Sequence, residues 1–410
     1  MPNVSPSIPL VPVSAVSPAE AAYAPAAPKA SHSTRESRAV LPRSESGSAF
    51  SNTITIAEPL RSILTRARFA PSGDNTQPWR FEVISNQHIV IHGRDTRHDC
   101  IYDLRGHASL IALGALLETI SIAASTHGFR VHFSRRQNMP AHQPTFDAHF
   151  EHSGALTADP LSAMIEQRVT QRRPMRSRAL TTEQIAALTA ALPAGYRVEL
   201  RQSFSQRFQL AKLLFRSAHI RLTTREAFET HRKVIQWNAT FSDDRIPDKA
   251  VGVDLLTRKL MRWAMRSWSR INFLNRFLAG TIMPRVQLDF VPALRCAGHF
   301  FLIADQAPQS TDDFVSAGRA LQRYWLAATQ QNLLVQPEMT PLIFAQYDKQ
   351  TITFSASKKA IVRASAVRKE LDEMLTPDIC NRTVFMGRIG TGKQPSSRSL
   401  RLPLEKLLVS

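Results

Sequence analysis

The sequence predicts an α+β protein with two similar helical stretches. One apolar helix is expected over residues 108–127 and a second over residues 312–332, and the two match at a constant offset of 204 positions. Residues 81–84 and 89–91 precede the first helix and have the pattern of paired strands. The chain has 410 residues, 43% of them hydrophobic, so it can bury a large core as two domains or as one large duplicated domain.

The two helical stretches share small and apolar residues at equivalent positions. The matches are Gly114 with Gly318, Leu117 with Leu321, Ala123-Ala124 with Ala327-Ala328, and Val131 with Val335. Gly128 and Asn332 follow the helices at the same offset, and both residue types tolerate a left-handed C-terminal cap. Two unrelated buried helices that use small residues alike would give the same match, so the helices alone do not establish duplication.

Residues 1–52 differ in composition from the rest of the chain. They are rich in Ala, Pro and Ser, with few long apolar side chains, so we expect a disordered tail. Prolines interrupt each apolar run there, which argues against a signal peptide. The whole chain has 52 Lys and Arg against 33 Asp and Glu, a net charge of +19, while the tail is nearly balanced. The basic character therefore belongs to the folded part.

Cysteine and histidine spacing excludes several classes of protein. Cys100, Cys296 and Cys380 lie far apart without a C-x-x-C motif, which argues against a disulfide framework and fits a reducing, cytoplasmic compartment. The thirteen histidines show no ligand spacing, so no metal site is expected. The longest apolar stretches are short or interrupted by charge, and no membrane span is predicted.

The most informative motif covers residues 70–81, Ala-Pro-Ser-Gly-Asp-Asn-Thr-Gln-Pro-Trp-Arg-Phe. Ser72, Asn75 and Gln77 carry groups that can donate and accept hydrogen bonds, which suits a flat ring system with alternating carbonyls and ring nitrogens. An ordinary polar connection, with Trp79 in the core, would explain any four of these residues. It explains the complete string poorly.

A second motif places Arg168, Thr170 and Arg172 at alternate positions. In an extended segment these side chains point the same way and form a compact pocket for a phosphate. A solvated basic loop or a nucleic-acid patch would have the same composition, and composition alone favours the loop.

Residues 384–403 contain a third basic segment. Residues 387–393 superficially fit a phosphate-binding nucleotide loop, but Gln394 stands where a metal-binding Ser or Thr is required, and Pro395 follows. We therefore reject that interpretation. A strand ending in Arg388 and a loop with Lys393, Arg398 and Arg401 remain as candidates to face a phosphate.

Residues 253–278 are expected to form one basic amphipathic helix. Arginines recur at every fourth position from Arg258 to Arg270, beside Leu256, Leu260 and Trp263. A membrane-surface or nucleic-acid role fits this pattern. A solvated charged face on an ordinary helix also fits it and is favoured.

Together these motifs resemble those of the flavin-dependent nitroreductase family over residues 53–410. Residues 70–81 are similar to the loop with which that family contacts the isoalloxazine ring. Arg168-x-Thr170-x-Arg172 resembles its phosphate-gripping Arg-x-Ser-x-Arg, and residues 388–403 resemble its final phosphate-binding segment. Residues 336–340 stand where the family places backbone amides beside the flavin N5.

The motif order differs from that of an ordinary family member, because the ring loop comes before the arginine pair. In family dimers one subunit supplies the arginines and the other supplies the loop. The resemblance therefore implies a single-chain pseudo-dimer of two helix-wrapped sheet halves, similar to relatives labelled as molybdopterin-biosynthesis or FMN-sequestering proteins. Its halves would cover residues 53–165 and 166–410, with a helical lid over about 221–290, and such a chain is expected to be monomeric.

The resemblance implies that one FMN moves two electrons from NADH or NADPH to a small electrophilic acceptor. Trp237, Trp263 and Trp268 in the lid would cover the flat ligand. His231 is interpreted as structural, no proton donor is assigned, and solvent or the lid would supply the proton. The residues expected to bind FMN are Ser72, Asn75, Gln77, Arg168, Thr170, Arg172, Pro337, Glu338, Met339, Thr340, Arg388, Lys393, Arg398 and Arg401.

Two functions of other classes stay open beside this one. An FMN storage or sensor protein would have a closed lid that excludes a second substrate. Nucleic-acid binding is motivated by the +19 charge, but no dedicated recognition motif supports it, and it is placed last.

Overall fold

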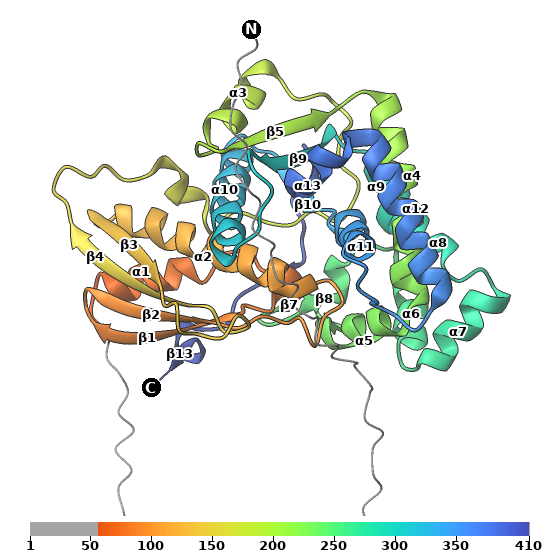
Figure 1. Cartoon of the computed structure of the whole chain (residues 1–410), viewed down its shortest axis with the longest axis horizontal. Helices are drawn as coiled ribbons and strands as arrows, with labels where there is room; N and C mark the ends of the chain where they lie inside the picture. Colours follow the sequence, from red (N-terminus) through yellow and green to blue (C-terminus); the bar gives the residue numbers. More distant parts are fainter. Residues whose placement is uncertain (1–55, 410) are drawn as a thin grey trace, which may run out of the picture. The chain divides into compact units, whose positions relative to one another are not determined.

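The computed structural model describes residues 56–409, and the tail predicted over residues 1–52 lies outside them. The described residues belong to one compact unit in which helices surround two main sheets (Figure 1). The predicted α+β class is therefore confirmed. The expected boundary at residues 165 and 166 does not separate the two halves completely, because the C-terminal strand pairs with a strand of the first half.

The first sheet has the strand order β13-β1-β2-β4-β3. Its strands are β1 (Trp79–Ser85), β2 (His88–Gly93), β3 (Phe129–Arg135), β4 (Thr145–His152) and β13 (Leu408–Val409). The four long strands are antiparallel, whereas β13 pairs in parallel with β1. One face packs Phe81, Ile89 and Phe146 into the core shared with α1 (Leu60–Ala67) and α2 (His107–Ser125).

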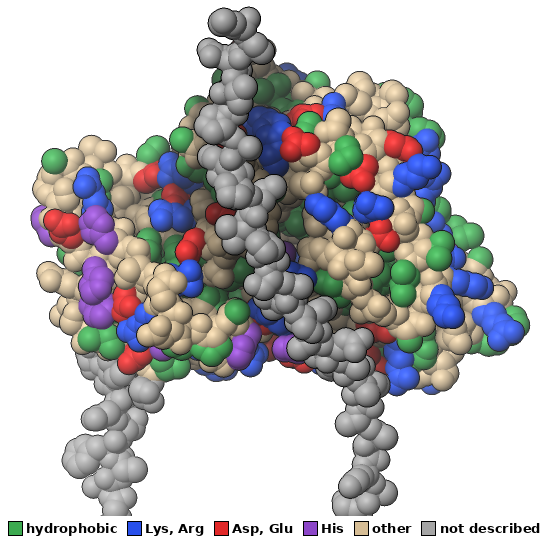
Figure 2. Space-filling model, in the orientation of Figure 1, with side chains coloured by type: hydrophobic (Ala, Val, Ile, Leu, Met, Phe, Trp, Pro, Cys, Tyr) green, Lys and Arg blue, Asp and Glu red, His purple; other side chains and the backbone are tan. Residues whose placement is uncertain are grey.

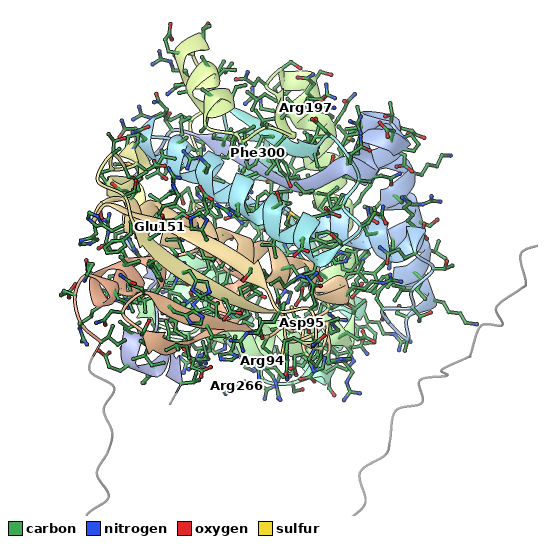
Figure 3. All side chains as sticks on the ribbon, turned by 60° about the vertical axis from the view of Figure 1, so that its left-hand side comes forward. Arg94, Asp95, Glu151, Arg197, Arg266 and Phe300 are labelled. Carbon is green, nitrogen blue, oxygen red and sulfur yellow. The ribbon has the colours of Figure 1, made fainter. Side chains whose placement is uncertain are left out.

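The second sheet has the strand order β10-β11-β9-β5 and is antiparallel throughout. Its strands are β5 (Tyr196–Arg201), β9 (Gly298–Ala304), β10 (Leu334–Pro337) and β11 (Thr383–Gly390). Every residue of β9 and β11 is buried, because helices cover both faces of the sheet. Phe300 joins the core that contains α10 (Thr311–Gln330), and Phe301 joins a second core on the opposite face. Figure 3 shows Phe300 in the interior of this half.

The second core is formed by helices that follow the strands of the second sheet. These are α4 (Phe204–Thr223), α11 (Thr340–Lys349), α12 (Lys358–Leu375) and α13 (Pro377–Arg382). A shorter helix, α3 (Thr182–Ala190), precedes β5 and begins with a capping box formed by Thr181 and Gln184.

Helices α2 and α10 lie side by side at the centre of Figure 1 and cross at Gly114 and Gly318. A Cβ on Gly114 would clash with the carbonyl of Val315, and a Cβ on Gly318 would clash with the carbonyl of Ile111. At the offset of 204, Ile111 corresponds to Val315 and Gly114 to Gly318, so the contact is reciprocal. Reciprocal contacts are typical of a two-fold interface, which favours the interpretation of the two helices as repeats.

The ends of these helices also correspond. Gly128 has φ of 72° and Asn332 has φ of 56°, so both predicted left-handed stops are confirmed. The segment Leu104–Ser125 is long and apolar enough to cross a membrane, yet 89% of its most apolar window is buried inside the molecule. It is therefore a core helix here, packed against α1 and α10.

The expected lid is a helical insertion between the second sheet's first two strands. It contains α5 (Arg225–Val234), α6 (Leu255–Ala264), α7 (Trp268–Phe277), α8 (Ile282–Arg285) and α9 (Val291–Leu294), with the short strands β6 (Ile235–Gln236), β7 (Phe241–Ser242) and β8 (Ile246–Pro247). The prediction of one helix over residues 253–278 is wrong. The Ser267 hydroxyl accepts a hydrogen bond from the Arg270 amide and begins a new helix there.

Candidate functional site

A cavity of about 1080 Å³ lies where the loop of residues 70–78, the start of α2, the end of β10 and the insertion meet. Twelve of the fourteen residues predicted from the sequence line it. They are Ser72, Asn75, Arg168, Thr170, Arg172, Pro337, Glu338, Met339, Thr340, Arg388, Arg398 and Arg401. The structure therefore brings together four segments that are far apart in the sequence: residues 72–75, 168–172, 337–340 and 388–401.

Gln77 does not line the cavity, contrary to the prediction. Its side chain is 1% exposed, and its amide nitrogen donates to the Asp243 carbonyl at 2.8 Å. Its amide oxygen accepts a hydrogen bond from the Leu402 amide at 2.9 Å. Asp74, Asn75 and Gln77 all have positive φ, so the backbone of this loop is strained and needs such anchoring. Gln77 thus positions the loop.

The segment Arg168 to Arg172 runs beside the edge of the second sheet. Thr170 forms a parallel bridge with Val335, and the Gln171 amide donates to the Val335 carbonyl at 3.0 Å. Arg168, Thr170 and Arg172 consequently face the cavity, as the alternation predicts. The Gln171 side chain points away and donates to the Lys393 carbonyl at 2.7 Å. Lys393 is exposed and off the cavity, so its predicted phosphate contact is not supported.

Arg168, Arg398 and Arg401 form a cluster that we call the arginine triad. Arg401 donates to the Ala70 carbonyl at 3.0 Å and to Asn75 Oδ1 at 2.8 Å, and Arg168 donates to the Phe69 carbonyl at 2.9 Å. Arg398 comes from β12 (Arg398–Ser399), which pairs in parallel with β7 of the insertion. The Arg398 guanidinium donates to the Glu166 carbonyl at 3.1 Å. Two guanidinium groups of the triad are thus held by the carbonyls of residues 69–70, and the third is held by Glu166.

The arginine triad concentrates positive charge without a carboxylate. Burial, followed by repulsion from Arg401 and Arg398, holds the pKa of Arg168 well below its usual range. Burial, Arg398 and Arg68 lower the pKa of Arg401 to about 9. Within residues 56–409, no Asp or Glu side chain forms an ion pair with the triad, and Arg168 Nε is buried without a hydrogen-bond partner. This arrangement is typical of an anion site.

Arg172 lies apart from the triad and faces Asp74. Burial lowers the pKa of Arg172, while the nearby Asp74 carboxylate partly restores it. Burial likewise raises the pKa of Asp74 against the opposing effect of Arg172. The two side chains put opposite charges on the same stretch of cavity wall.

Arg388 lines the cavity and also belongs to a buried ion network, so its phosphate contact stays a prediction. Its guanidinium donates to Glu338 Oε1 at 2.7 Å and to the Arg172 carbonyl at 2.8 Å. Glu338 Oε2 lies 2.7 Å from His299 Nδ1, while His299 Nε2 lies 3.0 Å from the Ala293 carbonyl. Burial disfavours the imidazolium, but the Glu338 carboxylate and the Cys296 side chain together outweigh burial and raise the pKa of His299 to about 10. Both ring nitrogens then donate.

Only part of the predicted row of backbone amides at residues 337–340 is available. Pro337 has no amide hydrogen, and the Glu338 amide donates to the Met386 carbonyl at 2.9 Å within the sheet. The amides of Met339 and Thr340 stand at the N-terminus of α11, where the helix leaves its first amides without internal partners. Both residues line the cavity.

The lid lines the cavity with aliphatic side chains, and its tryptophans do not contribute. Trp237, Trp263 and Trp268 are absent from the wall, and Trp263 is exposed on the outer surface. The lining residues of α6 to α8 include Leu260, Met261, Ile271, Leu274, Leu278 and Met283. The aromatic wall comes from α10 instead, where Trp325 lies under the Arg168 guanidinium at 4.6 Å.

One hydrogen-bonded pair on the cavity wall, Tyr102 and His231, was not predicted to belong to the site. The Tyr102 hydroxyl lies 3.0 Å from His231 Nε2, and both side chains line the wall. Burial raises the pKa of Tyr102, whereas burial and the nearby Arg221 lower the pKa of His231 to about 3. At neutral pH the tyrosine is therefore protonated and donates to a neutral imidazole. The residues are 129 positions apart, and no local motif links them.

A group of potential metal ligands lies outside the cavity, on the outer face of the first sheet. Ligand atoms of His88, Asp147 and His149 lie within 4.8 Å of one another. The sequence spacing did not reveal it because the two histidines stand on neighbouring strands. Both carboxylate oxygens of Asp147 accept hydrogen bonds from Arg136 at 2.8 Å, so the group is already charge-neutralised.

Comparisons with known proteins give distant similarities. No family model matches the chain. The uncharacterized protein MT1398 of Mycobacterium tuberculosis (strain CDC 1551 / Oshkosh) is 24% identical over 357 residues, which are 84% of this chain and 47% of that protein. The chain thus spans about half the length of this curated relative.

Among solved structures, a nitroreductase-like family protein from Bacillus cereus is 12% identical, with a TM-score of 0.32, over 62% of this chain and 97% of that chain. The FMN-dependent nitroreductase NfnB from Mycobacterium smegmatis, in complex with NADPH, is 15% identical, with a TM-score of 0.32, over 59% of this chain and 94% of that chain. A nitroreductase with bound FMN from Bacteroides fragilis NCTC 9343 is 9% identical, with a TM-score of 0.31, over 57% of this chain and 89% of that chain. These similarities are too distant to assign the chain to a family.

Proposed function

We propose that this protein is an FMN-dependent oxidoreductase of the nitroreductase type. It would move two electrons from NADH or NADPH to a small electrophilic acceptor. The observation that carries the proposal is the arginine triad, three partly or fully buried cations without a carboxylate, at one end of a cavity with polar loop atoms and an apolar wall.

The described residues fit FMN in charge, shape and size. A phosphate would supply the negative charge that Arg168, Arg398 and Arg401 lack. Ser72 provides a hydroxyl on the cavity wall that can still donate to a heteroaromatic ring. The Asn75 amide is bonded to Asp243 and Arg401, so it holds the loop and the triad in place. Ligand pockets are commonly ~300–1,000 Å³, and a cavity of about 1080 Å³ leaves room for an acceptor beside the cofactor.

The chain's own residues would bind, polarise and shield the cofactor. Bound FMN supplies the hydride chemistry that no side chain can perform. The N-terminus of α11, with the free amides of Met339 and Thr340, favours negative charge placed near it. The aliphatic side chains of the insertion exclude water from the opposite wall.

Tyr102 is the candidate to hold a transferable proton. Its hydroxyl is protonated at neutral pH, faces the cavity, and is oriented by His231 at 3.0 Å. His231 belongs to the insertion, so the pair joins the lid to the residues that precede α2. A proton taken from Tyr102 would leave a tyrosinate near Arg221, whose guanidinium favours that anion.

The test is the visible spectrum of the purified protein, before and after anaerobic addition of NADPH or NADH. We expect a bound-flavin spectrum that bleaches and then recovers with a nitroaromatic or a quinone. A flavin spectrum that neither nucleotide bleaches would instead support FMN storage or sensing. Colourless protein that fails to take up added FMN would refute both functions.

A further inference from the structure

The insertion carries most of the exposed apolar surface of the described chain. Fourteen large apolar side chains are strongly exposed in residues 56–409, and nine of them lie in residues 255–283. They are Leu255, Leu256, Leu260, Trp263, Phe273, Phe277, Leu278, Ile282 and Met283. An apolar concentration of this kind marks a surface that contacts another body, because scattered exposure would spread over the whole molecule.

The same 29 residues are strongly basic. They contain Arg258, Lys259, Arg262, Arg266, Arg270 and Arg276, and no Asp or Glu. Figure 2 shows Lys and Arg side chains beside hydrophobic ones at the right-hand edge, where α7 lies in Figure 1. Arg266 stands at the outer edge of the molecule in Figure 3.

Apolar and basic side chains form adjacent stripes on α6. Leu256, Leu260 and Trp263 follow one another at spacings of four and three residues, which places them along one side of the helix. Lys259 and Arg266 are exposed next to that stripe. On α7 the rings of Phe273 and Phe277 lie 5.2 Å apart, with Arg276 over Phe277 at 5.5 Å. Aromatic and aliphatic groups flanked by Arg and Lys are typical of helices that lie in a membrane interface.

We propose that this face of α6, α7 and α8 docks on the surface of an anionic lipid membrane. Arg258 pairs with Asp248, but the other five cations form no ion pair within the described residues and complement anionic headgroups. The leucines and phenylalanines would enter the boundary between headgroups and acyl chains. A second copy of this chain is disfavoured because it would bring like charges together. Nucleic acid offers nothing for Leu256, Ile282 and Met283 to enter.

Docking would place one wall of the cavity on the membrane. Leu260, Leu278 and Met283 are at least half exposed and also line the cavity, so they belong both to the apolar set of the insertion and to the cavity wall. The proposed lipid surface is therefore continuous with that wall. An acceptor dissolved in the membrane would reach the cavity past these side chains. The docking proposal itself does not depend on the bound cofactor.

The test is co-sedimentation of the full chain with vesicles of phosphatidylcholine alone and of phosphatidylcholine with 30% phosphatidylglycerol, as ~0.1 M salt is raised to ~0.5 M. We expect binding to the anionic vesicles, weakened by salt, and little binding to the neutral ones. Replacing Lys259, Arg266 and Arg276 with Ala should lower the affinity about 100-fold, from about fivefold for each charge. These three exposed side chains form no hydrogen bond or ion pair within the described residues, so their removal leaves the fold intact.

The apolar contribution is tested by Leu256→Asp with Phe277→Asp. Phe204→Asp with Val362→Asp is the matched control, because those two side chains are equally exposed elsewhere. The first pair should abolish vesicle binding, and the control pair should leave it unchanged. Equal binding to neutral and anionic vesicles, or none to either, would overturn the proposal. So would a concentration-dependent dimer that Leu256→Asp dissociates, or tighter binding to duplex DNA than to vesicles.

Discussion

Two groups of buried arginine lie on the same cavity and differ in how their charge is balanced. Arg388 donates to Glu338, which also binds His299, so each charge in this network has a protein partner. Arg168 and Arg401 donate to carbonyls and an amide oxygen, and no carboxylate neutralises them. Burial of an arginine therefore does not by itself indicate a ligand. The lack of a counter-charge among the described residues does indicate a ligand, because an isolated buried charge is costly.

The largest effect is expected when the balanced network is broken. Glu338→Gln removes the carboxylate that Arg388 and His299 share and leaves both groups buried without it. Breaking a buried ion pair in this way costs about 3–5 kcal/mol. Urea unfolding followed by circular dichroism measures it. A loss below about 1 kcal/mol would show that the network is not the stabilising element described.

The same network should make stability fall at alkaline pH. The pKa of His299 in the folded protein, about 10, lies above its ordinary value of 6.5, so the stabilisation is complete below pH 6.5 and is lost as pH rises through 10. We expect the free energy of unfolding to decline between pH 7 and pH 10. In Glu338→Gln the decline should be flatter, because the carboxylate that holds the proton is gone. Equal slopes in both proteins would contradict this assignment.

The arginine triad should respond in the opposite way: the loss of one of its charges should weaken ligand binding more than it lowers the free energy of unfolding. Arg168→Met keeps apolar packing on Trp325 but removes a charge, so it should weaken FMN binding by about 1.5–3 kcal/mol. The free energy of unfolding of the cofactor-free protein should stay within about 1 kcal/mol, since lost repulsion offsets the lost contact to Phe69. Fluorescence titration measures the affinity. Lys393→Met, off the cavity, is the control and should bind FMN normally.

The smallest effect should come from inorganic phosphate. If the arginine triad is an anion site, phosphate at five times its dissociation constant stabilises the cofactor-free protein by about 1 kcal/mol. Thermal unfolding with and without phosphate, at constant ionic strength, measures the gain. Arg168→Met should lose it, whereas Glu338→Gln should keep it. A gain that survives in Arg168→Met would place the anion elsewhere.

The sequence motifs correctly predicted the features that depend only on local backbone geometry. The alternation of Arg168, Thr170 and Arg172 requires only an extended segment, and the stops at Gly128 and Asn332 require only a residue that tolerates positive φ. The twelve lining residues come from four short segments that converge on the cavity. The prediction that these residues share one site rested on the resemblance, since no pattern in one segment reveals the position of the others.

The predictions failed mainly for side chains whose hydrogen-bond partners are distant in the sequence. Arg388 pairs with Glu338, fifty positions away, a contact that no motif indicates. The Gln77 amide is bonded to Asp243 and Leu402, so this side chain is not free for a ligand. The regular arginine spacing predicted one helix over residues 253–278 because it continues across the break. Ser267, which caps the start of α7, is a residue type that favours the beginning of a helix. The arginine periodicity outweighed this signal in the prediction.

The connection of the C-terminal segment to the first half affects how the protein is made. Arg68 and Arg401, which are in contact, stand 333 positions apart, and β13 completes the sheet that begins with β1. At about 5–20 residues per second, a ribosome needs roughly 20–70 s to reach Arg401 after it has synthesised Arg68. The first half therefore waits with an unpaired strand edge and an incomplete anion site. An anion can consequently bind the complete triad only after translation has passed Arg401.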